Sequence, residues 1–164
     1  MLNLDQELQN FIDQHLPAVQ RLEFRIEAAS AERVILSAPL EANINDKKTA
    51  FGGSQQMLAL TCAWSLVYLN MIDAGLKHQQ FVVAEVNTKY RKPVNSSRFY
   101  AVSVRDDALS DFTNTAREGT PSRATNGAYV FDASDATPLM EKSDIAGDLK
   151  TAATILEARF ATTK

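Results

Sequence analysis

Two adjacent glycines and a serine, Gly52-Gly53-Ser54, stand directly before the most apolar segment of the chain. That segment is predicted to be a helix, and free backbone N–H groups at a helix N-terminus stabilise negative charge. Because glycine has no Cβ, a ligand can approach this backbone closely. The arrangement could polarise a carbonyl oxygen, with the Gly53 N–H as the main donor and Ser54 assisting. The simpler alternative is a tight turn in which Ser54 caps the helix.

A reaction at a carbonyl carbon also needs a nucleophile or a group that presents water. Asp46 could be a general base if burial favoured its protonated form, but beside two lysines it could also be a solvated loop acid. Asn45 could orient water or the carbonyl, or shape the loop as an Asx turn. Thr61 lies two helical turns after Ser54 and could hold a water, unless its hydroxyl bonds back to its own helix. Glu85 is a further candidate for this task. Because it lies in a strand rich in Val and Ala, it could instead be an outward-facing charge.

The segment 55–73 is apolar on every side of a helical wheel, which is typical of a helix buried all round. A bilayer span would need about 18–20 clean apolar residues, and polar residues interrupt this run: Thr61, Ser65, Tyr68 and Asn70. The sequence therefore predicts a central helix of a water-soluble protein over residues 54–74, ended by Gly75.

The remaining segments mostly predict antiparallel strands. Residues 4–16 predict an amphipathic helix, and strands are expected over 22–28, 33–38, 81–93, 98–105, 124–133 and 149–162. Residues 95–97 are expected to form the turn between the third and fourth of these strands, while 106–123 and 135–147 are expected to be connections. The last strand competes with a helical interpretation. A sheet can bury every side of the helix only by curling around it, which predicts an α+β hot-dog fold.

Composition limits the class of protein. The chain has 164 residues and a formal net charge of 17 − 20 = −3, so we expect a single domain over 1–164, with 1–17 forming its N-terminal helix. The mild acidity argues against nucleic-acid binding. One Cys and two His are too few for a structural zinc site, and no cofactor or metal is expected. The N-terminus lacks the features of a signal peptide, and no membrane partner is expected, so we predict a cytoplasmic protein.

Two segments carry a resemblance to a known superfamily. Residues 45–54 (NDKKTAFGGS) and 90–94 (YRKPV) resemble the Gly-Gly helix start and the Tyr-Leu-x-Pro-Val strand ending of hot-dog thioesterases. More narrowly, residues 38–64 resemble the thioesterase domain of the YiiD C-terminal type, often fused to an acetyltransferase. The resemblance covers about 22–105. It implies a hydrolase of acyl thioesters, acting on acyl-coenzyme A or acyl-carrier-protein esters as a homodimer or dimer of dimers.

The chain departs from the wider superfamily at two places. Relatives often have a His before the Gly-Gly pair, where this chain has Phe51, and many carry an acid in the central helix, where this chain has Leu60 and Thr61. The catalytic carboxylate of those relatives therefore has no counterpart here. The residues expected to act in catalysis are Asn45, Asp46, Gly53, Ser54 and Thr61, and those expected to contact the substrate are Phe51, Gly52, Met57, Trp64, Tyr90 and Arg91.

Several of these residues have a simpler interpretation. Trp64 and Tyr68 could line an acyl tunnel or only pack in the core or a dimer interface. A basic cluster around one expected hairpin could bind the phosphates of coenzyme A or only be a solvated surface: Lys89, Arg91, Lys92 and Arg98. Cys62 is expected to be a small buried residue. The alternative function is a non-catalytic module that binds an acyl ligand; a hot-dog hydratase or dehydratase is disfavoured because neither His is suitably placed.

Overall fold

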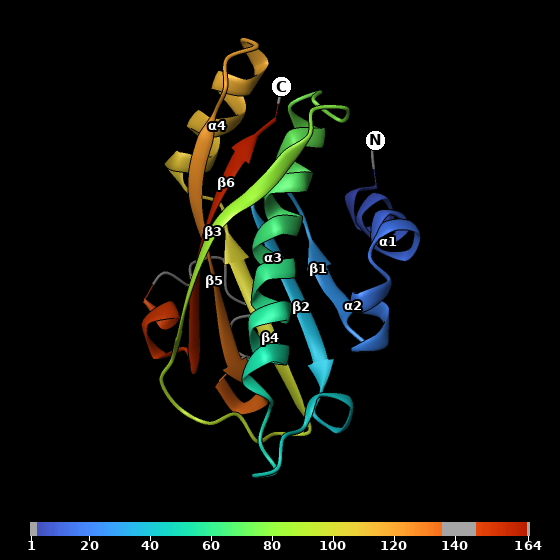
Figure 1. Ribbon diagram of the computed structural model, residues 1–164, viewed down its shortest axis with the longest axis vertical. Helices are drawn as coiled ribbons and strands as arrows, with labels where there is room; N and C mark the ends of the chain where they lie inside the picture. Colours follow the sequence, from blue (N-terminus) through green and yellow to red (C-terminus); the bar gives the residue numbers. More distant parts are fainter. Residues whose placement is uncertain (1–2, 136–146, 164) are drawn as a thin grey trace.

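A curled antiparallel sheet wraps around one long helix, α3 (Gly52–Asp73), in the computed structural model, which describes residues 3–135 and 147–163 (Figure 1). Within these residues the sheet has six strands in the order β1-β2-β4-β5-β6-β3. The strands are β1 (Arg25–Ala29), β2 (Arg33–Pro39), β3 (Phe81–Tyr90), β4 (Arg98–Val104), β5 (Arg123–Asp132) and β6 (Thr154–Thr162). The predicted α+β hot-dog fold is confirmed.

The central helix is buried because the concave face of the sheet surrounds it. α3 contacts β2, β3, β4, β5 and β6, and its buried residues include Leu58, Leu66 and Leu69, which are fully inaccessible to solvent. The helix begins at Gly52, two residues before the predicted start, and Gly75 follows its end with a positive φ of 78°. Glycine adopts this left-handed conformation without strain, as the sequence predicted for the helix end.

Two short helices and two 3₁₀ turns complete the N-terminal and loop regions. α1 (Leu4–His15) buries Leu8 and Ile12, as the amphipathic pattern predicted, and α2 (Pro17–Arg21) follows it directly. The turns are η1 (Glu41–Asn43) and η2 (Asp148–Thr151). The described helices include none with the length and hydropathy that crossing a bilayer requires.

The strands over 81–93 and 98–105 were expected to be joined by a turn, and that prediction is wrong. β3 lies at one end of the described sheet and pairs with β6, whereas β4 lies between β2 and β5. The segment that leaves β3 instead crosses beneath the start of α3, where the Val94 carbonyl accepts from Ala50 N–H at 2.8 Å. The Asp132 carboxylate holds the same segment by accepting from the N–H groups of Asn95 and Ser96.

The connection predicted over 106–123 is also wrong, because it contains the helix α4 (Asp107–Arg117). Asp106 caps it by accepting from Leu109 N–H at 2.9 Å. The apolar residues that it buries recur at helical spacing, namely Leu109, Phe112 and Ala116. The polar composition between them concealed this pattern.

The boundaries of three predicted strands also differ from the structure, and the one predicted over 81–93 ends at Tyr90. The first begins at Arg25 rather than residue 22, because Phe24 N–H still bonds the Val19 carbonyl and Glu23 has a positive φ of 58°. The last segment is a strand, as predicted, but only from Thr154. Most of the expected connection over 135–147 lies outside the described residues.

Candidate active site at the start of the central helix

The loop before α3 is shaped by the side chain of Asn45. Its Oδ1 accepts from the N–H groups of Lys47 (2.8 Å) and Thr49 (3.1 Å), and its Nδ2 donates to the Thr49 hydroxyl at 2.9 Å. These bonds form the Asx turn that was the alternative interpretation. Asp46 lies exposed beside it and pairs with Lys47 at 3.1 Å. The structure therefore brings Asn45 and Asp46 to one loop, with Asp46 solvated within this chain.

Gln55 fixes this loop against the first turn of the helix, and the sequence analysis did not single it out. Its buried amide donates to the Ala50 carbonyl at 2.9 Å and accepts from the Thr154 hydroxyl at 2.6 Å. The loop is further tied by Phe51 N–H, which donates to the Asn43 carbonyl at 2.7 Å. In the sequence, Gln55 is one of several polar residues in a mostly apolar helix, which is a weak signal.

The first turn of α3 leaves backbone donors available. Phe51 occupies the N-cap position and makes no side-chain capping bond, and the first helical hydrogen bond runs from Gln55 N–H to the Phe51 carbonyl at 3.0 Å. The N–H groups of Gly52, Gly53 and Ser54 precede that bond, so they have no partner within the helix. Ser54 is buried inside the first turn, and the alternative that it caps the helix is wrong.

Two aromatic rings frame these donors. A Cβ placed on Gly53 would lie 2.5 Å from Cε1 of Phe51, so the Phe51 ring lies over this glycine. The Tyr90 hydroxyl donates to the Gly52 carbonyl at 2.9 Å, and burial raises the pKa of Tyr90, which keeps the phenol protonated. Phe51 is 55% exposed and Tyr90 52% exposed, so both rings lie at the surface of the described chain. The structure thus brings four predicted residues together: Phe51, Gly52, Gly53 and Tyr90.

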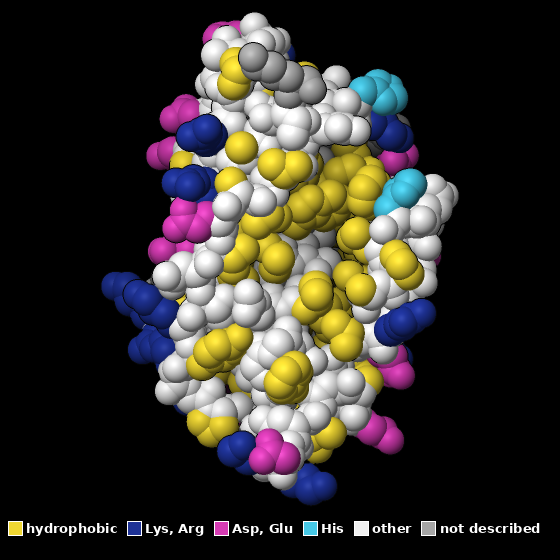
Figure 2. Space-filling view, in the orientation of Figure 1, with side chains coloured by type: hydrophobic (Ala, Val, Ile, Leu, Met, Phe, Trp, Pro, Cys, Tyr) yellow, Lys and Arg dark blue, Asp and Glu magenta, His cyan; other side chains and the backbone are white. Residues whose placement is uncertain are grey.

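An apolar pocket of about 310 Å³ lies along α3 and begins at Met57, one turn after Gly53. Met57, Leu60, Thr61 and Trp64 line it from the helix; the 15–19 segment and Val83 complete it. Figure 2 shows hydrophobic side chains gathered along a hollow in this face of the molecule. Gly53, Met57, Leu60 and Trp64 follow one another at the spacing of a single helix face, so the pocket and the free donors share that face.

Thr61 is buried in the wall of this pocket. Among residues 3–135 and 147–163 its hydroxyl makes no side-chain hydrogen bond, so the structure does not show the back-bond to its own helix that was the alternative. The hydroxyl is a polar group in an otherwise apolar lining, and it can hold a water or a ligand atom.

Trp64 separates this pocket from a second one of about 400 Å³, whose lining it also joins. Its ring stacks between Tyr68 (5.0 Å between centroids) and Phe81 (5.5 Å), and Phe11 of α1 lies 5.0 Å away. Trp64 therefore packs in an aromatic cluster and also lines a cavity, and its role toward an acyl chain stays a prediction.

The basic residues expected around one hairpin do not all gather at one site. Arg98 reaches the Ser37 hydroxyl at 2.8 Å, and Lys92 pairs with Asp135 at 3.0 Å. Lys89 and Arg91 lie on the convex face of the sheet, whereas the hydroxyl of Tyr90 reaches α3. Successive strand residues point to opposite faces, which explains why Arg91 is separated from the helix start.

Glu85 and Cys62 have structural roles. Glu85 is exposed and pairs with Arg159 of β6 at 2.8 Å, as an outward-facing charge. Cys62 is fully buried; its thiol lies 3.4 Å from the carbonyl oxygens of Val34 and Ala101, and burial raises its pKa far above the ordinary value. Among residues 3–135 and 147–163, no group of three His, Cys, Asp or Glu side chains gathers at a distance that could hold a metal ion.

Comparisons with known proteins agree with this fold. A family model described as "Putative thioesterase (yiiD_Cterm)" matches residues 5–137. The fold is similar to a crystal structure of a protein of unknown function from Chlorobaculum tepidum (29% identity, 98% of this chain and 94% of that chain, TM-score 0.83). It is also similar to a "putative thioesterase" from Shewanella oneidensis (17% identity, 100% of both chains, TM-score 0.78). A third similar structure is a thioesterase from Haemophilus influenzae (12% identity, 100% of this chain and 92% of that chain, TM-score 0.67).

Proposed function

Because the chain belongs to this thioesterase family, we propose that it hydrolyses acyl-coenzyme A or acyl-carrier-protein thioesters in the cytoplasm at the start of α3. The observation that carries the proposal is the uncapped first turn of α3, which continues on the same helix face into an apolar pocket. The N–H groups of Gly52 and Gly53 would receive the thioester oxygen, and the acyl chain would lie along Met57 and Leu60. One well-aimed donor of this kind lowers a barrier by about 2.7–4 kcal/mol.

In the proposed reaction a water oxygen attacks the thioester carbon, and negative charge grows on the carbonyl oxygen beside the Gly53 N–H. The water proton passes to a base as the C–O bond forms. The C–S bond then breaks, and the base returns this proton to the leaving sulfur, so that the thiol and the acid are released. Thr61 would hold the water from inside the pocket, with Ser54 assisting at the first turn. Asp46 is our candidate base and Asn45 its positioning residue, since the Asn45 side chain orders the loop that carries Asp46.

We further propose a homodimer, or a dimer of dimers, formed through β3. This strand ends the described sheet, so one of its edges has no neighbouring strand there, and it exposes Val82 and Val83. An exposed, apolar edge strand favours pairing with another strand. Phe51 and Tyr90, exposed beside the helix start, would then lie close to the second subunit, and Asp46 would lose solvent.

The competing function is an acyl-ligand binding module without turnover, and the absence of an acid at Leu60 and Thr61 favours it. A hydrolysis assay over acetyl- to palmitoyl-coenzyme A, with Asp46→Asn and Glu41→Gln as a matched pair of loop acids, separates the two functions. We expect turnover with at least one chain length, unchanged in Glu41→Gln and reduced at least tenfold in Asp46→Asn. Binding of an acyl ligand with no turnover above background would reject the hydrolase.

A further inference from the structure

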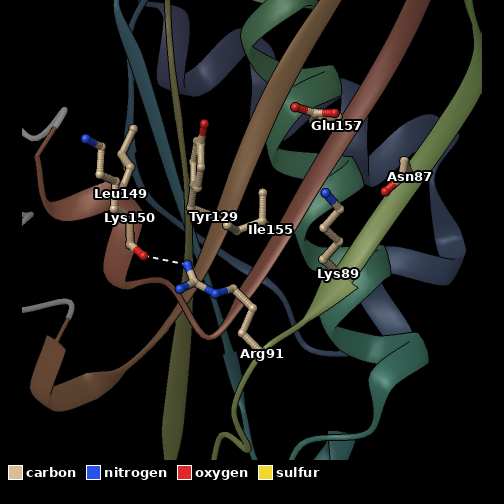
Figure 3. A pocket seen from close by; sticks show the side chains of 8 residues that line it. All are labelled: Asn87, Lys89, Arg91, Tyr129, Leu149, Lys150, Ile155 and Glu157. Atoms are coloured by element: carbon tan, nitrogen blue, oxygen red, sulfur yellow. Dashed lines mark hydrogen bonds between the residues drawn. The ribbon is translucent and has the colours of Figure 1, made fainter.

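A pocket of about 510 Å³ lies on the convex face of the sheet, away from the apolar pockets beside α3 (Figure 3). β3, β5, β6 and η2 supply its lining: Asn87, Lys89, Arg91, Tyr129, Leu149, Lys150, Ile155 and Glu157. None of these residues serves the proposed hydrolysis directly. A ligand of this pocket is therefore inferred from the chemistry of these lining residues.

The lining of this pocket carries a net positive charge. Lys89, Arg91 and Lys150 face one acid, Glu157, so the formal charge of the lining is 3 − 1 = +2. Glu85 and Arg159, also on this face, form a pair of opposite charges. Within residues 3–135 and 147–163, none of the three cations lies within 4.0 Å of a carboxylate oxygen.

Arg91 is held in place before any ligand arrives. Its guanidinium donates to the Lys150 carbonyl, as the dashed line in Figure 3 marks. A guanidinium has five N–H donors, so most of them stay available, and their planar fork suits the oxygens of a phosphate group. Lys89, two residues earlier on β3, shares this face of the strand and adds a second cation.

The centre of the pocket is apolar and contains an aromatic ring. Tyr129 lies between η2 and Ile155, and a Cβ placed on Gly127 would lie 3.2 Å from its hydroxyl oxygen. The absence of a side chain at Gly127 therefore gives the ring room along the sheet. Burial, with the nearby charges of Glu157 and Asp106, raises the pKa of Tyr129, so its hydroxyl stays a neutral donor.

An apolar, aromatic floor edged by cations fits a ligand that joins a flat ring to phosphate groups. We propose that this convex-face pocket binds a nucleotide, with the base against Tyr129 and Ile155 and the phosphates against Lys89, Arg91 and Lys150. One source is the nucleotide end of an acyl-coenzyme A substrate, which rests on the proposed function. Tyr90 touches the helix start and Arg91 follows it directly, so one extended ligand could reach both places around the end of β3. The other source is a free nucleotide.

The first experiment measures binding of adenosine 3′,5′-bisphosphate and of ADP to the full chain by calorimetry. Arg91→Ala and Lys89→Ala should each weaken binding about tenfold or more, because each removes a charge-assisted contact. Arg123→Ala is the matched control: it lies on the same face of β5 as Tyr129, about 20 Å away at six residues, and should leave binding unchanged. Glu157→Gln should tighten binding, since it removes the one opposing charge.

The absence of measurable binding to the unmodified protein, or equal affinity in Arg91→Ala and Arg123→Ala, would overturn the proposal. The source is decided with an acyl-coenzyme A and an acyl-pantetheine of the same chain, which lacks the nucleotide. If Arg91→Ala raises KM only for the coenzyme A ester, the nucleotide end of the substrate occupies the pocket. Nucleotide binding with KM unchanged for both esters assigns it to a free nucleotide. Nucleotide binding with no hydrolysis of either ester would reject the proposed function and leave the pocket assigned.

Discussion

The hydroxyl of Tyr90 donates to the carbonyl oxygen of Gly52 over 2.9 Å, which ties the end of β3 to the first turn of α3. The backbone that would receive the substrate oxygen is therefore positioned partly by a side chain from the far edge of the sheet. A Cβ on Gly52 would already stand 3.4 Å from the Tyr90 ring, so ring and helix are in close contact.

Tyr90→Phe should keep the ring and remove this single bond. Because the hydroxyl is at the surface, we expect a loss of unfolding free energy of only about 0.5–1.5 kcal/mol. Hydrolysis should fall several-fold, mainly in kcat, as the first turn loses its tether. Steady-state kinetics and thermal unfolding check both values, with Tyr100→Phe, on another strand, as the control. Unchanged kcat would mean that Tyr90 serves folding only.

Gly53→Ala separates folding from activity at the helix start. Alanine favours a helix by up to about 1 kcal/mol over glycine, and the ring that its Cβ would meet belongs to Phe51, which is exposed and can rotate. We therefore expect little change in melting temperature. The displaced ring and the new methyl group should obstruct the Gly53 N–H and lower kcat/KM at least tenfold.

The double variant with Phe51→Ala tests this interpretation of Gly53→Ala. It removes the obstructing ring and should restore part of the activity, while Phe51→Ala alone should affect kcat/KM less. Activity equal to that of the unmodified protein in Gly53→Ala would contradict a role for this amide.

Gln55→Leu should destabilise the chain through two lost hydrogen bonds. The Ala50 carbonyl and the Thr154 hydroxyl would both lose a buried partner, at a cost of about 1–3 kcal/mol, or roughly 2–10 °C in melting temperature for a chain of this size. Urea unfolding measures the loss of unfolding free energy, and Gln14→Leu on the exposed surface of α1 is the control. A shift no larger than that of Gln14→Leu would show that this bridge contributes little.

Trp64→Leu should alter which acyl chains are accepted, because Trp64 separates the 310 Å³ pocket from the 400 Å³ pocket. Removing the indole should let longer chains extend into the second pocket, with a gain of about fourfold in kcat/KM for each further methylene buried. Acyl-coenzyme A esters from butyryl to palmitoyl give the profile. Trp64→Phe, which keeps a ring, should shift it less. Profiles of the same shape would exclude a role for Trp64 in selecting chain length.

Cys62 makes stability depend on pH in the alkaline range. Its thiol stays protonated in the folded chain because burial raises its pKa. In the unfolded chain the thiol ionises at about pH 8.5. Above that pH the unfolded state binds fewer protons than the folded state, so this group's contribution to stability falls, by up to about 1.4 kcal/mol per pH unit.

Urea unfolding between about pH 7 and pH 10, compared with Cys62→Ala, tests this prediction. The variant should be less stable at neutral pH but should lose less stability on raising the pH. The folded protein should also resist thiol reagents at neutral pH. Parallel pH profiles of the two chains would contradict it.

The hot-dog fold could be predicted because its strongest determinant is local: a segment apolar on every side needs a sheet around it. The pairing of β3 with β6 could not, since it joins strands more than 60 residues apart and depends on how the 91–97 segment crosses beneath α3. Helix α4 carries its own sequence signals, the cap residue Asp106 and the helical spacing of Leu109 and Phe112, but the polar residues between them favour a connection.

The candidate site also has features that the sequence predicts and features that it does not. The Gly-Gly helix start could be read from the sequence, whereas the bond between Tyr90 and Gly52 joins residues 38 positions apart, and no pattern in either segment shows it. Gln55 was overlooked because its partners, Ala50 and Thr154, become neighbours only in three dimensions. The role of Asp46 stays a prediction for the hydrolysis assay above, and the role of Thr61 stays a prediction as well.

The N-cap position of α3 holds a phenylalanine, where Ser, Thr, Asp or Asn would each satisfy a backbone donor. Phe51→Asp should therefore make the protein more stable, by about 1 kcal/mol, and at the same time block the amides with its own carboxylate. Natural selection would then have kept the less stable residue for the sake of activity, the trade-off expected where a functional site needs unsatisfied groups. A screen for thermostable variants of this chain should select capping residues at position 51, and these variants should lose hydrolytic activity.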